Sequence, residues 1–237
     1  MKEITARYLK LKTLAPQQPM YGLLPERAWN YGFSWIQQAT LFTRPLELAL
    51  DVYRTAFTNR VVVDWENPGE ISFYNLNGDS YAQSIQLSAN TSFSDRVEFR
   101  FAYKSYDIQT TYRSGMKRVP LQPKNRWFAF LGYATEPLDG KQWRADATVH
   151  RVGQQRLVAT NSTQERMANG FSLLSSQVTR QFSDKFSVYF GAENLLDVKQ
   201  SDAVLGANDP FGASFDTSQT YAPVFGRMFY AGFRFNL

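Results

Sequence analysis

Residues 228–237 read MFYAGFRFNL, and this last stretch of the chain indicates the fold more clearly than any other. Apolar and polar side chains alternate with a period of two, which is typical of a β-strand with one apolar face. That face carries Phe229, Ala231, Phe233, Phe235 and Leu237. A strand this long and aromatic would aggregate if left uncovered in water. We therefore expect it to be paired or to face lipid.

The same alternation recurs along most of the chain. It is clear over 29–41, 46–53, 84–93, 97–104, 143–150 and 186–191, and weaker over 127–134 and 171–182. No apolar stripe with helical spacing is sustained. With residues 229–237, the pattern predicts an all-β chain of about nine antiparallel strands.

The connections between these strands alternate in length. Short links with turn-forming residues fall at 42–43, 94–95, 137–140 and 183–185. Long links fall at 58–79, 113–125, 152–169 and 198–226. Outer-membrane barrels have short periplasmic turns and long extracellular loops. We therefore predict part of an up-and-down transmembrane β-barrel.

Composition narrows the classes of function. The chain of 237 residues has no cysteine, so it forms no disulfide or thiolate site. Its 16% aromatic content suits rings at a membrane–water boundary. A mean hydropathy of −0.39 agrees with strands whose two faces differ. The net charge of +5 is not gathered into a basic patch, so we expect no nucleic-acid partner.

No arrangement of residues predicts catalysis, a metal site or a cofactor. His150 is the only histidine, and Asp146 lies four residues away in a strand. That spacing separates the two by about 13 Å, too far for one metal ion. Nucleophile-elbow and phosphate-loop motifs are absent. The acidic stretch 64–70 lacks the order of a calcium loop and is interpreted as a solvated turn. We expect the protein not to be an enzyme.

Four short motifs resemble those of TonB-dependent outer-membrane receptors. Residues 191–197, GAENLLD, resemble the G-x-E-N-L-F/L-D segment near the end of these receptors. Residues 226–232, GRMFYAG, resemble the entry to their last strand. ERAWNYG at 26–32 and the P-x-x-P-x-x-R pattern at 120–126 resemble two earlier strand starts. The resemblance extends over about residues 22–237 and is specific through the order of the motifs.

The resemblance implies a role for several residues. Residues 26–237 would be the C-terminal part of the receptor barrel, and 1–25 an extracellular loop or a disordered lead-in. The family motif would comprise Glu193, Asn194, Leu195 and Asp197. The closing strand would carry the barrel-assembly signal, made of Phe229, Phe233, Phe235 and Leu237. The usual last residue of such a signal in outer-membrane proteins is Phe, so Leu237 is a milder match.

Alternation also selects a lumen-facing set of side chains. It comprises Arg100, Lys104, Arg144, Asp146, His150 and Arg234. In the intact receptor family this wall surrounds a plug domain and the ligand path. We interpret the set as contacts to the plug in preference to ligand recognition.

The implied location is the Gram-negative outer membrane. Outer-membrane lipid and the barrel assembly machinery would be partners. The intact receptor would add a plug domain, TonB and a small nutrient ligand such as an iron chelate, cobalamin or a glycan. Signal peptide, TonB box and plug are not found in these residues, so we expect a barrel fragment that does not transport alone. Two alternatives stay open: a soluble or surface β-rich binding protein, and a small porin assembled from more than one chain.

Overall fold

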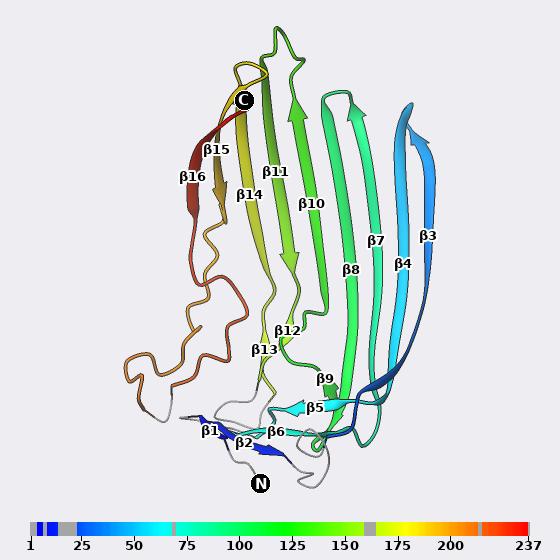
Figure 1. Cartoon of the computed structure of the whole chain (residues 1–237), viewed down its shortest axis with the longest axis vertical. Coiled ribbons are helices and arrows are strands. Elements are labelled where there is room, and N and C mark those ends of the chain that lie inside the picture. Colours follow the sequence, from blue (N-terminus) through cyan, green and yellow to red (C-terminus); the bar gives the residue numbers. More distant parts are fainter. Residues whose placement is uncertain are drawn as a thin grey trace.

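The computed structural model describes residues 4–6, 9–13, 23–67, 70–158, 165–212 and 215–236. One antiparallel sheet dominates it, with the strand order β16-β15-β14-β11-β10-β8-β7-β4-β3 (Figure 1). Its strands are β3 (Arg27–Leu41), β4 (Arg44–Asn59), β7 (Ser80–Ser94), β8 (Val97–Tyr112), β10 (Asn125–Ala134), β11 (Gln142–Val152), β14 (Phe171–Gln181), β15 (Phe186–Glu193) and β16 (Met228–Phe235). Each strand pairs with its neighbour in this series, which confirms the predicted all-β, up-and-down arrangement.

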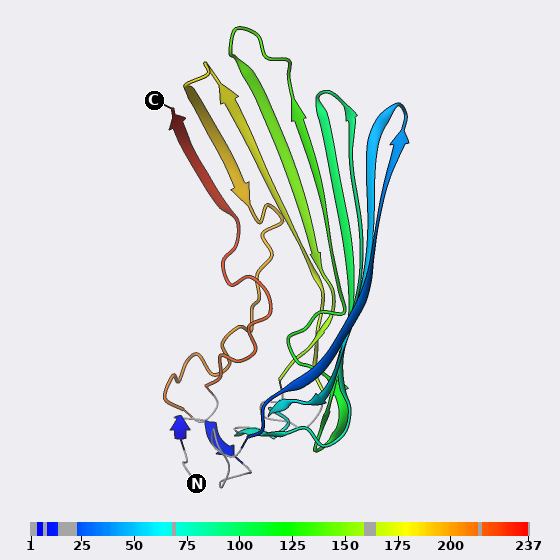
Figure 2. The ribbon, with the colours of Figure 1, turned by 45° about the vertical axis from the view of Figure 1, so that its right-hand side comes forward.

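The sheet is open, with β3 and β16 at its two edges (Figure 2). Short turns lie at one end of the strands, close to the C-terminal end of β16, and the long connections gather at the other (Figure 1). Among the described residues there is no helix of the length and apolarity needed to cross a bilayer.

Short strands that the sequence did not predict lie ahead of β3 and within the long connections. They are β1 (Ile4–Ala6), β2 (Leu9–Thr13), β5 (Val61–Asp64), β6 (Glu70–Asn75), β9 (Gly115–Arg118), β12 (Gln155–Arg156) and β13 (Met167–Ala168). β1, β2, β6 and β5 form a second sheet, in which β2 runs parallel to β6. β9 extends the main sheet by pairing with β8.

Strand register gives the main sheet one apolar face. Val52 lies opposite Ile85, and Phe190 lies opposite both Val178 and Ala231. Large side chains on this face are exposed, with Phe233 at 72%. An apolar surface of this extent suits lipid contact.

The opposite face is polar, and glycines on it lie beneath tyrosine rings. Gly32 is opposite Tyr53, Gly191 opposite Tyr230, and Gly232 opposite Tyr189. At each glycine an added Cβ would overlap the facing ring. These pairs are called the glycine–tyrosine contacts below.

Buried apolar side chains collect mainly in the long connections and not within the sheet, because a single layer of strands cannot cover its own faces. Those at the long-connection end are Val62, Ile71, Tyr112, Leu157, Val158, Ala168 and Ala203. We call this end of the molecule the loop assembly.

Candidate functional site

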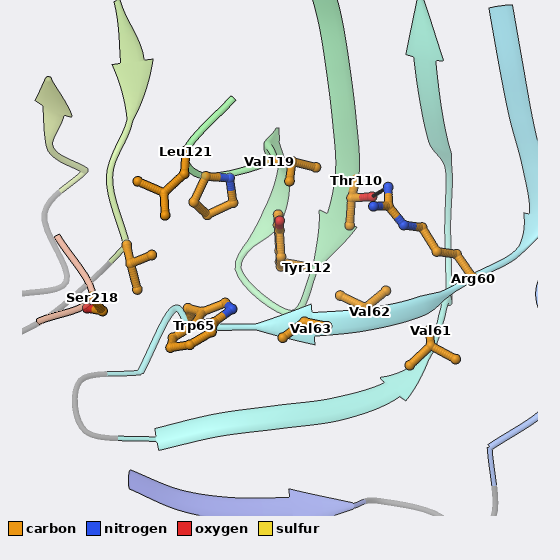
Figure 3. Close-up of a pocket in the computed structure, with 12 residues that line it drawn as sticks. Arg60, Val61, Val62, Val63, Trp65, Thr110, Tyr112, Val119, Leu121 and Ser218 are labelled. Carbon is orange, nitrogen blue, oxygen red and sulfur yellow. Dashed lines mark hydrogen bonds between the residues drawn. The ribbon is translucent and has the colours of Figure 1, made fainter. Parts of the chain in front are cut away.

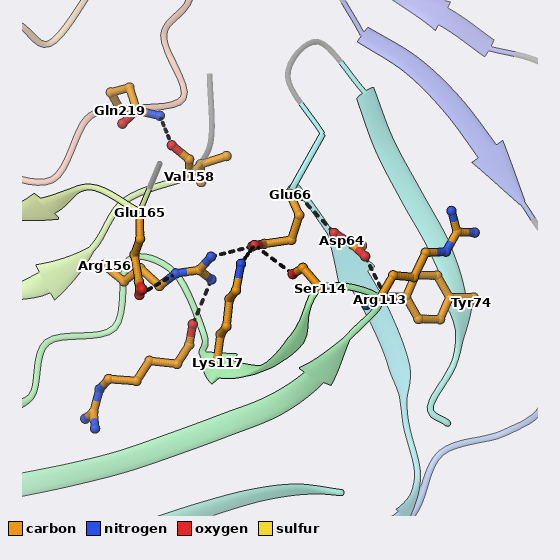
Figure 4. Close-up of polar contacts among 11 residues, drawn as sticks. Asp64, Glu66, Tyr74, Arg113, Ser114, Lys117, Arg156, Val158, Glu165 and Gln219 are labelled. Atoms are coloured by element: carbon orange, nitrogen blue, oxygen red, sulfur yellow. Dashed lines mark hydrogen bonds and ion pairs between the residues drawn. The ribbon is translucent and has the colours of Figure 1, made fainter. Parts of the chain in front are cut away.

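Glu66 is the centre of the loop assembly, and it joins three connections that are far apart in sequence (Figure 4). Its carboxylate oxygens lie 2.5 Å from Lys117 Nζ and 2.5 Å from Arg156 Nη2. Ser114 Oγ donates to it at 3.2 Å. The side chain of Arg156 is only 3% exposed and that of Glu66 11%. We call Glu66, Lys117 and Arg156 the ion cluster.

Further contacts fix the ion cluster in place. Arg156 Nη1 donates to the Arg118 carbonyl at 3.0 Å, and its Nε forms an ion pair with Glu165 at 2.9 Å. The Glu66 N–H donates to Asp64 at 2.9 Å, and Tyr74 donates its hydroxyl to the same carboxylate at 2.5 Å. The prediction of a solvated turn was therefore wrong for Asp64 and Glu66. Tyr74 of the same connection holds Asp64, and Lys117 and Arg156 of two distant connections hold Glu66.

The electrostatics of the ion cluster favour a charged Glu66. Burial by itself would raise the pKa of its carboxyl, but the hydrogen bonds and charges of Lys117 and Arg156 outweigh burial and lower that pKa. Close by, burial raises the pKa of Tyr112 to about 12, so this phenol is neutral at physiological pH.

Acidification is expected to loosen the loop assembly. Because the folded pKa of Glu66 lies below its ordinary value of 4.5, its stabilisation is fully present above pH 4.5. It is lost as the pH falls through the lowered pKa. Hydrogen exchange of the amides in 60–67, followed from pH 6 to pH 3, should therefore show less protection at acid pH after correction for intrinsic rates. Glu66→Gln should abolish this change, and unchanged protection of the unmodified protein would contradict the assignment.

A cavity of about 360 Å³ lies in the loop assembly (Figure 3). It adjoins the ion cluster, because the ring centre of its lining residue Tyr112 lies 5.7 Å from the guanidinium carbon of Arg156. Apolar side chains make most of its lining, including Val62, Trp65, Tyr112 and Leu121. Arg60 is at its edge, but its Nη1 already donates to Ser80 and Thr110 at 3.1 and 3.0 Å. The cavity therefore offers shape and apolar contact more than charge.

The predicted family motif closes the long connection between β15 and β16. Asn194 and Asp197 both have positive φ, 51° and 55°. The Asn194 side chain donates to the carbonyls of Val198 and Phe225 and accepts from the Val198 N–H. Asp197 accepts from the Arg227 N–H at 2.8 Å, which lowers the pKa of its carboxyl. Asn194 and Asp197 thus tie together the start and end of the connection.

Glu193 and Leu195, the other motif residues, have different environments. Glu193 is exposed at the end of β15. Leu195 N–H donates to the Leu174 carbonyl at 2.7 Å, which anchors the motif to β14.

Three buried glutamines hold the loop assembly together, and sequence reasoning missed them. Gln155, Gln200 and Gln219 are 4%, 7% and 1% exposed. Gln200 accepts from the N–H groups of Tyr221 and Ala222, and Gln219 donates to the Val158 carbonyl at 3.0 Å (Figure 4). No local pattern marks them. Gln155 and Gln219 donate to carbonyls on other connections, and the partners of Gln200 lie 21 and 22 residues farther along its own connection.

Strand register places all six lumen candidates on the polar face. It brings Arg144, Asp146 and Arg234 to one groove of about 410 Å³ near the short turns. Arg100 instead pairs with Glu98, Lys104 Nζ lies 5.3 Å from the Tyr106 ring, and the His150 ring lies 5.9 Å from that of Phe128.

The predicted assembly-signal residues Phe229, Phe233 and Phe235 lie on the apolar face of β16 and are 61%, 72% and 59% exposed. Leu237 lies outside the described residues. In the part of the chain that the structure describes, no group of three acidic or histidine side chains could hold a metal ion.

Comparison with known families identifies the class of this protein. The model of the TonB-dependent receptor-like β-barrel family matches residues 4–195. The chain belongs to this family, as the sequence motifs predicted. No curated protein matches the chain significantly.

Solved structures with a similar fold include three iron-chelate receptors. The ferric-catecholate import receptor Fiu of E. coli K12 is 16% identical, with a TM-score of 0.61 over 91% of this chain and 28% of its own. The ferripyoverdine receptor of the Pseudomonas aeruginosa outer membrane is 16% identical, with a TM-score of 0.60 over 90% and 27%. A mutant of the ferric enterobactin receptor of P. aeruginosa is 13% identical, with a TM-score of 0.61 over 96% and 32%. The chain thus spans about a third or less of each of these receptors.

Proposed function

We propose that this chain forms a C-terminal barrel segment, residues 26–237, and part of the extracellular mouth of a TonB-dependent receptor that takes up an iron chelate. The loop assembly is the observation that carries this proposal. All the long connections between main-sheet strands fold together at one end of a sheet that is apolar on one face and polar on the other. An iron chelate is favoured over cobalamin or a glycan because the similar structures are named for ferric ligands.

The partners follow from the same arrangement. The apolar face would contact outer-membrane lipid, and β16 would be read by the barrel assembly machinery. The polar groove at Arg144, Asp146 and Arg234 would face the plug domain of the intact receptor. Energy for transport would reach that receptor through TonB, so the wall needs no catalytic residue and the protein is not an enzyme. This segment alone is expected not to transport.

Insertion into the outer membrane is the first test. Fused to an export signal, the chain is expected to fractionate with outer membranes and to resist extraction by carbonate. The double substitution Val188→Asp and Phe190→Asp on the apolar face should reduce insertion severalfold, because carboxylates would enter hydrocarbon. Gln177→Asp and Thr179→Asp on the polar face is the matched control and should insert normally.

The result also separates the alternatives. A chain that stays soluble and monomeric in the periplasm would overturn the proposal in favour of a soluble β-rich protein. A compact, heat-modifiable dimer in detergent would favour the two-chain porin. Restored uptake of labelled ferric chelate in a receptor-null strain would show that the segment transports alone, against our expectation.

A further inference from the structure

Two arginines that are connected through other side chains lie on the apolar face of the main sheet near the loop assembly. Arg54 on β4 lies opposite Tyr31 and Gln83. This row of the apolar face is next to the row of Val52 and Ile85, on the side of the loop assembly. Arg118 on β9 lies opposite Gln109 of β8, farther along the same end. The register shows that both arginines belong to the face that carries the exposed aliphatic and aromatic side chains.

A network of side chains links these arginines. Arg54 Nη1 donates to Gln83 Oε1 at 3.0 Å, and its guanidinium carbon lies 4.5 Å from the centre of the Tyr81 ring. Tyr81 donates its hydroxyl to Asp107 at 2.8 Å. Asp107 also accepts from Gln109 at 2.9 Å and pairs with Arg118 at 2.8 Å. We call Arg54, Tyr81, Gln83, Asp107, Gln109 and Arg118 the arginine collar.

The arginine collar carries an excess of positive charge. Its one carboxylate, Asp107, pairs with Arg118. Among the residues that the structure describes, no carboxylate pairs with Arg54, whose partners are an amide oxygen and a ring. The Asp107 and Arg118 side chains remain 41% and 25% exposed. An anionic group can therefore approach the collar from outside the sheet.

We propose that the arginine collar binds the phosphorylated sugar headgroup of a lipid whose acyl chains lie on the apolar face beside it. On the side of the collar that faces away from the loop assembly, hydrocarbon contact is offered by exposed apolar side chains. These are Phe33, Ile85 and Leu87, which are 60%, 41% and 46% exposed. A guanidinium binds phosphate through paired, charge-assisted hydrogen bonds. The amides of Gln83 and Gln109 and the 57% exposed ring of Tyr31 suit a sugar better than a small headgroup.

Arginines on the polar face of the sheet show why position matters. Arg100 and Arg144 lie on the polar face, where they contact Glu98 and Gln142. A phosphate bound there could not place its acyl chains on the apolar face. Arg151 of β11 also lies on the apolar face near the loop assembly, but it is a single arginine, whose Nη1 donates to Ser172 Oγ at 3.3 Å. The arginine collar differs because Gln83, Tyr81 and Asp107 connect two arginines beside the exposed apolar side chains. The inference rests on the proposed function only in placing the apolar face in lipid, with the loop assembly on the outer side.

Binding to defined glycolipids tests this inference. The full chain, folded in zwitterionic detergent micelles, would be titrated with diphosphorylated lipid A and with the same lipid after removal of its phosphates. We expect the phosphorylated lipid to bind more tightly. Arg54→Gln should weaken that binding about tenfold, while Arg54→Lys should retain most of it. Arg96→Gln, which removes one positive charge from a short turn at the opposite end, should bind as the unmodified protein does.

Each outcome decides between the two claims. Equal affinity for the two forms of lipid A, or an Arg54→Gln variant that binds normally, would overturn the arginine collar as a phosphate site. Phosphatidylglycerol binding as tightly as lipid A would overturn the commitment to a phosphorylated sugar. A chain that stays soluble in water and does not associate with the micelles would overturn the proposed membrane function as well. In the first two cases that function would stand.

Discussion

Replacing Arg156 with methionine is expected to destabilise the loop assembly by about 3 kcal/mol, because it leaves the Glu66 carboxylate enclosed with one cation fewer. This loss of stability should be at the low end of the range for breaking a buried ion pair, since Lys117 still lies 2.5 Å from Glu66. Methionine keeps the apolar volume of the stem but cannot donate to the Arg118 carbonyl. The effect should be local, because the loop assembly has its own buried core.

Hydrogen exchange measured by mass spectrometry would resolve this local effect. Amides in 60–67, 115–121 and 155–158 should exchange about a hundredfold faster in Arg156→Met, whereas those of β10 and β11 should be unchanged. Glu165→Gln is the matched control: Glu165 is 50% exposed, so losing its pair with Arg156 should cost well under 1 kcal/mol. Wild-type exchange in Arg156→Met, or faster exchange throughout the sheet, would contradict the local role of the ion cluster.

A second substitution separates pairing from burial. If the penalty comes from the unpaired carboxylate, Glu66→Gln combined with Arg156→Met should recover part of the lost protection. A double variant that is worse than the sum of the two would instead show that each residue is needed for its own packing. Recovery would identify the ion cluster as a device that sets loop geometry. A preorganised mouth pays less ordering entropy when it binds a ligand.

The main sheet could be predicted from sequence because its two faces meet different surroundings. Each strand therefore has an alternation of apolar and polar residues that predicts it from its own sequence, as in residues 29–41 and 229–235. The short turns were equally visible, although Phe42 and Thr43 adopt positive φ of 48° and 66° without glycine. Alternation predicted that Arg144 and Arg234 lie on the polar face. It could not predict that they share one groove, because this depends on the registers of β14 and β15.

The loop assembly could not be predicted in this way. Lys117 and Arg156 are 51 and 90 residues from Glu66 in sequence, so no local sequence pattern predicts that the three side chains are in contact. The strands around them are short; β12 contains two residues and β5 four. Their stability comes from tertiary contacts and not from a periodic apolar face. For the same reason the acidic stretch 64–70 looked like a solvated turn.

The glycine–tyrosine contacts give the second prediction of large effect. β15 and β16 exchange them reciprocally, because Gly191 lies under Tyr230 and Gly232 lies under Tyr189, with the two ring centres 6.3 Å apart. Neither glycine has a positive φ, so backbone conformation does not require it. Glycine is required at both positions because the tyrosine rings approach so closely that an added Cβ would overlap them.

Gly191→Val is therefore expected to destabilise the sheet by about 2–3 kcal/mol, even though valine favours strands more than glycine does. The new side chain would displace the Tyr230 ring and break the hydrogen bond from its hydroxyl to Gln177, which is 3.1 Å long. Urea unfolding in detergent micelles, followed by tryptophan fluorescence, would measure the loss. Ala231→Val is the control, because it adds methyl groups to an exposed position on the apolar face of β16. Combining Gly191→Val with Tyr230→Ala should relieve the overlap, so that the pair costs less than the two single changes together. Strictly additive losses would mean that the ring and the glycine contribute independently and that β15 and β16 are not held by this contact.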